Sequence, residues 1–168
     1  MSDIIENKVA KSGIITLDLE ELKPHWDITS IDLTDYLWQG IALKEKDFRA
    51  ALADTDWSLL QGKHVFIHCS SDAIIPSWAF MLLAKEVSPF AATVVVGSES
   101  DLEKKLWADL IAQIDESEYQ DKRVILKGCS NQVIPQSVYF ELSSKLIPVV
   151  KSLMFGEPCS TVPVYKQK

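Results

Sequence analysis

The chain has 168 residues, a net charge of −7 and a pI near 4.9, with 47% hydrophobic and 24% charged residues. So acidic a chain lacks the basic face that releases counterions from a phosphate backbone, which argues against a nucleic-acid binder. It has no run of eighteen apolar residues and no basic and apolar start typical of a signal peptide, so we expect a soluble cytoplasmic protein. Because the number of cysteines is odd, we expect thiols that are free or metal-bound.

The first 62 residues show a less regular pattern than the rest. Segments 12–17 and 30–34 predict strands, the second with the alternating polarity of a sheet edge. Residues 44–54 predict a helix with Phe48 and Leu52 on one side. Because no linker or shift in composition separates this region, we expect an N-terminal extension packed on the core of a single domain spanning residues 1–168.

Residues 63–168 alternate between strand-like and helical patterns. The predicted strands are 63–69, 92–97, 123–126 and 152–155, and the predicted helices are 76–87, 98–114 and a third from Pro135 to near Pro148. A βαβαβαβ series predicts an α/β fold with a mostly parallel sheet between helical layers, a three-layer sandwich. We expect the core strands in the order 2-1-3-4, counted from 63–69.

The three cysteines share a local motif. Each is followed by a serine and, a few residues later, by a proline: Cys69-Ser-Ser-Asp-Ala-Ile-Ile-Pro, Cys129-Ser-Asn-Gln-Val-Ile-Pro and Cys159-Ser-Thr-Val-Pro. Each also falls at or just past the end of a predicted strand. In the expected strand order these strands are neighbours about 4.8 Å apart, so the three thiols would meet at the carboxyl edge of one sheet.

Three converging thiols predict a metal site, holding zinc or an iron–sulfur cluster. Tetrahedral zinc needs a fourth ligand, for which His68, Asp72 and Glu157 are the candidates. The serines that follow the cysteines, Ser70, Ser130 and Ser160, are expected to stabilise the thiolates by hydrogen bonds.

Two other interpretations stay open. One is a thiol-dependent enzyme or redox protein, in which His68 or Lys127 supplies the cation that stabilises a nucleophilic thiolate. The other is a structural or interaction scaffold, because unpaired cysteine is among the residues most often buried. The residues name no substrate, catalytic group or oligomeric state.

The motif segments also resemble a known family. Segments 68–76, 127–130 and 151–163, with Asn7-Lys-Val-Ala10 and Ser12-Gly-Ile-Ile15, are similar to the uncharacterised bacterial family called domain of unknown function 2480. The resemblance covers nearly the whole chain and implies no established activity. It does imply an association with iron–sulfur assembly components, which favours the metal interpretation and names iron–sulfur assembly proteins as possible partners.

Overall fold

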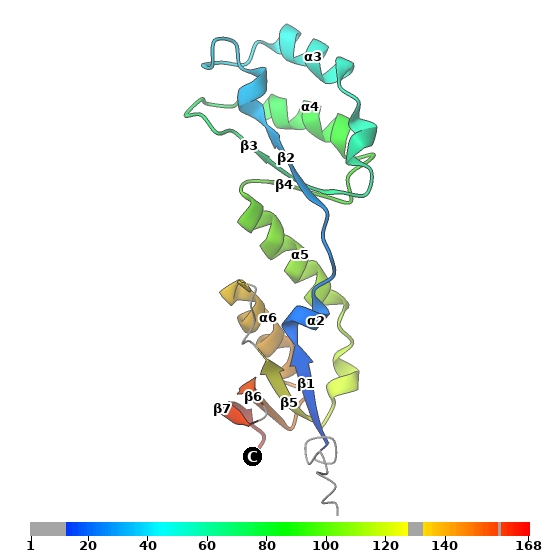
Figure 1. The fold of residues 1–168 in the computed structure, drawn as a ribbon, viewed down its shortest axis with the longest axis vertical. Helices are drawn as coiled ribbons and strands as arrows, with labels where there is room; N and C mark the ends of the chain where they lie inside the picture. Colours follow the sequence, from blue (N-terminus) through cyan, green and yellow to red (C-terminus); the bar gives the residue numbers. More distant parts are fainter. Residues whose placement is uncertain (1–12, 128–132, 158) are drawn as a thin grey trace, which may run out of the picture. The chain divides into compact units, whose positions relative to one another are not determined.

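The chain forms two β-sheets, each within its own compact unit (Figure 1). The computed structural model describes residues 13–127, 133–157 and 159–168. Unit 2 is the continuous segment His25–Leu106, and unit 1 combines the chain up to Pro24 with Trp107–Lys168. Unit 2 is therefore inserted in the sequence of unit 1.

Unit 2 has a three-stranded parallel sheet in the order β2-β3-β4. Its elements in chain order are β2 (Ile28–Asp32), the 3-10 helix η1 (Leu33–Tyr36), α3 (Glu45–Asp54), the 3-10 helix η2 (Trp57–Leu60), β3 (His64–His68), α4 (Ser77–Val87) and β4 (Thr93–Val96). The next helix, α5 (Glu99–Gln113), begins in unit 2 and ends in unit 1.

Unit 1 has a mixed sheet in the order β1-β5-β6-β7, in which only β7 is antiparallel to its neighbour. Besides the end of α5, its elements are β1 (Ile14–Asp18), α2 (Leu19–Leu22), the 3-10 helix η3 (Glu116–Tyr119), β5 (Arg123–Lys127), α6 (Gln136–Leu146), β6 (Ser152–Glu157) and β7 (Ser160–Lys166).

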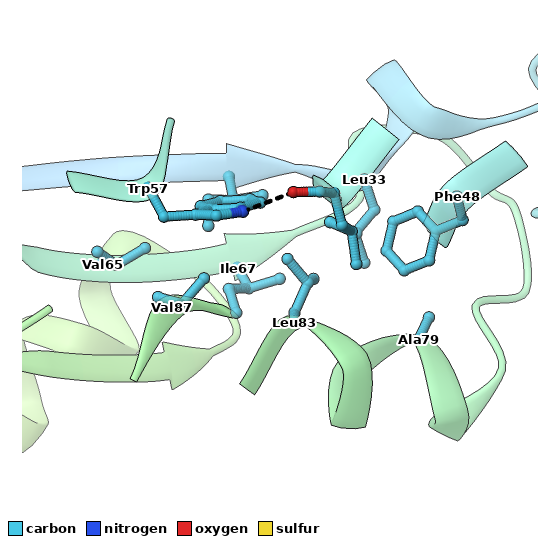
Figure 2. Close-up of a cluster of buried hydrophobic side chains, with 10 residues drawn as sticks. Leu33, Phe48, Trp57, Val65, Ile67, Ala79, Leu83 and Val87 are labelled. Carbon is cyan, nitrogen blue, oxygen red and sulfur yellow. Dashed lines mark hydrogen bonds between the residues drawn. The ribbon is translucent and has the colours of Figure 1, made fainter. Parts of the chain in front are cut away.

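The core of unit 2 lies between its sheet and its helices. Val65 and Ile67 alternate along β3 toward Leu83 and Val87 of α4, and Phe48 of α3 closes the cluster (Figure 2). The indole N–H of Trp57 donates to the carbonyl of Leu52 over 2.8 Å, so its polar atom is satisfied in this apolar setting (Figure 2). These buried side chains fix the ends of β2 and β3, where the candidate site lies.

The two units repeat one arrangement. Corresponding elements begin 59 residues apart: η2 and η3 at 57 and 116, β3 and β5 at 64 and 123, α4 and α6 at 77 and 136, β4 and β6 at 93 and 152. The turns before β3 and β5 match as well, because the N–H of Gly62 donates to Phe90 and that of Asp121 to Val149, both over 2.9 Å. Both turn residues have positive φ, at 74° and 59°. Unit 1 adds β7, which has no counterpart among the strands of unit 2.

The mixed α/β fold and most of the predicted elements are confirmed, but the single sheet with order 2-1-3-4 is wrong. The strands predicted at 63–69 and 92–97 do pair, as β3 and β4, and those at 123–126 and 152–155 pair as β5 and β6. The expected junction between 63–69 and 123–126 is absent, because β2 takes the place beside β3 and β1 the place beside β5. The N-terminal strands are thus sheet members rather than an extension.

Candidate functional site

The candidate site lies at the carboxyl ends of β2 and β3 in unit 2. Asp32, the last residue of β2, caps η1 by accepting the backbone N–H of Thr34 over 2.9 Å. The same carboxylate oxygen accepts the N–H of Ser70 over 3.1 Å. Hydrogen bonding by the Ser70 side chain, followed by the Thr34 backbone N–H, holds the pKa of Asp32 well below its usual range. Asp32 therefore ties the segment after β3 to the turn after β2.

Hydroxyl groups surround the thiol of Cys69. The Sγ atom lies 3.3 Å from the Oγ of Ser71 and 3.5 Å from the Oγ1 of Thr34. The Thr34 hydroxyl is itself held in place, because it accepts the N–H of Ser70 over 3.1 Å and lies 3.0 Å from the Ser70 Oγ. Ser71 accepts the N–H of Ala73 over 3.4 Å. We call these four residues, Thr34, Cys69, Ser70 and Ser71, the Cys69 site.

This setting stabilises the thiolate form. Hydrogen bonds from Ser71 and then Thr34 lower the pKa of Cys69, while partial burial and the negative charge of Asp32 oppose them. Cys69 is half-buried and packs against the core cluster of unit 2, so its position is fixed on one side and open on the other. The result is a positioned thiol with an increased thiolate fraction.

His68 does not join Cys69 in these contacts. Its ring stacks on Phe66, with centroids 5.3 Å apart, two residues back along the same strand. Because side chains alternate along a strand, His68 points away from the face that carries the buried Ile67. Asp72 lines a shallow pocket beside Gly40, Ile41 and Ala42. Ser70 contacts Thr34, and it is Ser71 whose hydroxyl reaches the thiol.

The other two cysteine motifs lie in the part of the chain assigned to unit 1. Cys129 and Ser130 fall outside the described residues. Cys159 is exposed between β6 and β7, and Ser160 opens β7 opposite Glu157. The sheet requires glycine just before this connection, because Gly156 has φ of 122° and a Cβ there would lie 2.5 Å from the Ser160 carbonyl oxygen.

The carboxyl edge of the unit 1 sheet carries charges in place of the hydroxyls. Lys127 ends β5, and its Nζ lies 2.7 Å from Oδ2 of Asp18 and 4.0 Å from Oε1 of Glu157. Asp18 also accepts the N–H of Glu20 over 2.9 Å, as Asp32 does with Thr34 in unit 2. The ammonium group lowers the pKa of Asp18, and the pKa of Lys127 is raised in return. Two of the residues proposed from sequence as thiol partners thus form a salt-bridge cluster.

One family model matches the chain over residues 3–167, described as protein of unknown function (DUF2480). The chain belongs to this family. No curated protein and no solved structure matches it. The DUF2480 description assigns no activity, so the chemistry of the site must come from its residues.

Two further findings concern the described residues of this DUF2480 member. Within residues 13–127, 133–157 and 159–168, no three His, Cys, Asp or Glu side chains gather as metal ligands would. In the same ranges, no helix combines the length and apolar character needed to cross a membrane. What the geometry does offer is a partly buried thiol at Cys69 whose pKa is lowered by neutral hydrogen-bonding groups.

Sequence reasoning located Cys69 and missed Asp32, Thr34 and Ser71. A signal for the first two was present: Leu17-Asp18-Leu19 and Ile31-Asp32-Leu33 place an aspartate between buried apolar residues at the end of both N-terminal strands. An aspartate at a strand end followed by a helical turn is typical of an N-cap. No signal in the sequence indicated that this cap reaches a segment 38 residues away.

Proposed function

We propose that the protein acts through a nucleophilic thiol at Cys69, as a thiol-dependent enzyme or redox protein. The observation that supports it is the pair of hydroxyl contacts to Sγ from Ser71 and Thr34. A cysteine that only fills space in a core needs no such partners, since the thiol itself is a weak hydrogen-bonding group. A thiolate gains from each donor directed at it.

The most economical reaction for this site is exchange with a sulfur–sulfur bond. The Cys69 thiolate attacks one sulfur of a disulfide or persulfide, a new S–S bond forms to Cys69, and the other sulfur leaves as a thiolate that takes up a proton. Such exchange requires a thiolate and access to it, and it needs no separate acid, base or oxyanion site. The Cys69 site supplies these two things.

The test is the alkylation rate of each cysteine, measured by mass spectrometry after brief exposure to iodoacetamide at several pH values. We expect Cys69 to react faster at neutral pH than the exposed Cys159, despite its partial burial, because a larger fraction of it is thiolate. Cys159 is the internal control, and Cys69→Ser confirms the assignment. A Cys69 that reacts more slowly than Cys159 across the pH range would exclude this proposal.

A second candidate is the metal site at the three cysteines, holding zinc or an iron–sulfur cluster and acting with iron–sulfur assembly proteins. The observation that favours it concerns two of the three: β5 and β6, the strands that precede Cys129 and Cys159, are parallel neighbours. Cys69 follows β3 of the other sheet, so the expected meeting of all three thiols at the edge of one sheet is wrong. Glu157 is a candidate ligand beside Cys159. Elemental analysis of protein purified without oxygen tests it: about one zinc ion, or stoichiometric iron and sulfide, supports the site, and a metal-free monodisperse protein rejects it.

A further inference from the structure

A row of positions crosses the unit 1 sheet at the amino ends of its parallel strands. In this row Ile14 pairs with Arg123, Arg123 with Ser152, and Ser152 with Lys166. Lys151 directly precedes Ser152. Three of the 17 basic residues of an acidic chain therefore gather on neighbouring strands. Arg123 and Lys166 are two strands apart, about 10 Å, so one small anion can lie close to both.

These side chains line a cavity of about 380 Å³, a size typical of small-molecule sites. Its lining includes the apolar Met154 and Pro163 from the paired strands β6 and β7. The described residues that line it are Ile14, Arg123, Lys151, Ser152, Met154, Pro163, Tyr165, Lys166 and Gln167.

Among the described residues, no Asp or Glu lines the cavity. Among the residues that the structure describes, the side chains of Arg123, Lys151 and Lys166 form no ion pair or hydrogen bond. Other cations of the chain do have partners, as Lys127 has Asp18 and Arg49 has Glu45. Three adjacent cations without an internal counterion form a surface that an anion from solution would neutralise.

Unit 2 provides an internal control for the fold. The positions 59 residues before Arg123 and Lys151 hold His64 and Ala92, which occupy the same places in its sheet. Each unit also has the same backbone hydrogen bond next to these positions. In unit 2 the N–H of Ala92 donates to the carbonyl of Lys63, and in unit 1 the N–H of Lys151 donates to the carbonyl of Lys122, each over 2.8 Å. The fold therefore forms without this pair of charges, and Lys166 stands on β7, which unit 1 alone possesses.

From this geometry we propose that the cavity binds a small anion that carries an apolar group, a phosphate monoester or a carboxylate. Arg123, Lys151 and Lys166 neutralise the anionic group, with the planar guanidinium of Arg123 able to donate two parallel hydrogen bonds. The apolar part packs on Met154 and Pro163, and the ring of Tyr165 adds a flat surface with a hydroxyl donor. This site is separate in sequence and in chemistry from the Cys69 site.

The test uses the full chain labelled with ¹⁵N and titrated with phenyl phosphate, benzoate, inorganic phosphate and benzyl alcohol, at constant ionic strength. We expect saturable shifts of the amide signals of Arg123, Lys151, Ser152 and Lys166 with at least one of the two aromatic anions. Whichever aromatic anion binds more tightly identifies the phosphate or the carboxylate class. Inorganic phosphate and benzyl alcohol should bind more weakly, because each lacks one half of the recognised chemistry.

The double variant Arg123→Gln, Lys151→Gln should weaken binding at least about tenfold, since it removes two charge-assisted contacts. Lys46→Gln, an exposed cation on α3 of unit 2, is the matched control and should leave the affinity unchanged. The proposal is overturned if neither aromatic anion gives saturable shifts, if inorganic phosphate or benzyl alcohol binds as well as the tighter aromatic anion, or if Lys46→Gln weakens binding as much as the double variant. Because the titration of the unmodified chain maps the site by itself, the result does not depend on the variants folding.

Discussion

Removing the hydroxyl of Ser71 should slow the alkylation of Cys69 without disturbing the fold. The Ser71 Oγ lies 3.3 Å from Sγ, and its hydrogen bond is the largest influence that lowers the pKa of the thiol. A hydrogen bond to a charged group contributes about 1.5–3 kcal/mol. Because Cys69 is partly exposed, water replaces part of the lost bond, so we take about half, roughly 0.7–1.4 kcal/mol. Ser71→Ala should then reduce the thiolate fraction at neutral pH about three- to tenfold.

The assay is the initial rate of Cys69 alkylation between pH 6 and 9, with the product quantified by mass spectrometry. The reduction should be largest at the acidic end and become smaller toward pH 9, as the thiol becomes increasingly ionised in both proteins. Ser77→Ala, a serine exposed on the first turn of α4, is the control and should leave the rate unchanged. An equal Cys69 rate in Ser71→Ala and the unmodified chain throughout this range would refute the thiolate argument.

Three further predictions concern stability. Because folding lowers the pKa of Asp32, its carboxylate stabilises the folded state above the ordinary aspartate pKa, and this stabilisation is lost as the pH falls below that value. Asp32→Asn should therefore make the free energy of unfolding, measured by urea denaturation, less dependent on pH in the acid range. An unchanged pH dependence would mean that the hydrogen bonds to Asp32 contribute nothing. Leu83→Ala, at a fully buried position of α4, should lower the free energy of unfolding by about 2–5 kcal/mol. Met81→Ala, on the exposed side of the same helix, should change it by no more than about 0.5 kcal/mol. Similar losses in the two variants would contradict the assigned core. If the metal candidate is right, Cys129→Ser should abolish both metal content and the sensitivity of thermal melting to chelator, and melting that chelator never affects in the unmodified chain would count against it.

Local patterns were enough to predict most of the elements, though not α2 or β7, and two of the strand pairs. The period of two along β3 and of about four along α5 reflects burial of one face, which is a property of neighbouring residues. Pro76 and Pro135 indicated the starts of α4 and α6, which begin one residue later. The pairs β3–β4 and β5–β6 follow from single helical crossovers between successive parallel strands.

The division of the strands between two sheets could not be predicted in the same way, because it depends on contacts between segments that are far apart in the sequence. β1 pairs with β5, with Ile14 opposite Arg123, although all of unit 2 lies between these two strands in the sequence. No local periodicity of apolar residues specifies this pairing. The Cys69 site has the same origin: Asp32 and Thr34 reach Ser70 only because β2 and β3 are paired. The sequence therefore predicted the thiol and could not predict the groups that surround it.

The insertion of unit 2 within unit 1 has a consequence for the order of events during synthesis. Every strand of the unit 2 sheet lies between residues 28 and 96, so this sheet can close while the ribosome is still making the rest of the chain. β1 is translated first, yet its partner β5 emerges only after that whole sheet, which leaves the apolar Ile14 and Ile15 without a strand neighbour in the meantime. The pairing of β1 with β5 must therefore wait until residues 123–127 have emerged, which makes this long-range contact a late step of folding during synthesis.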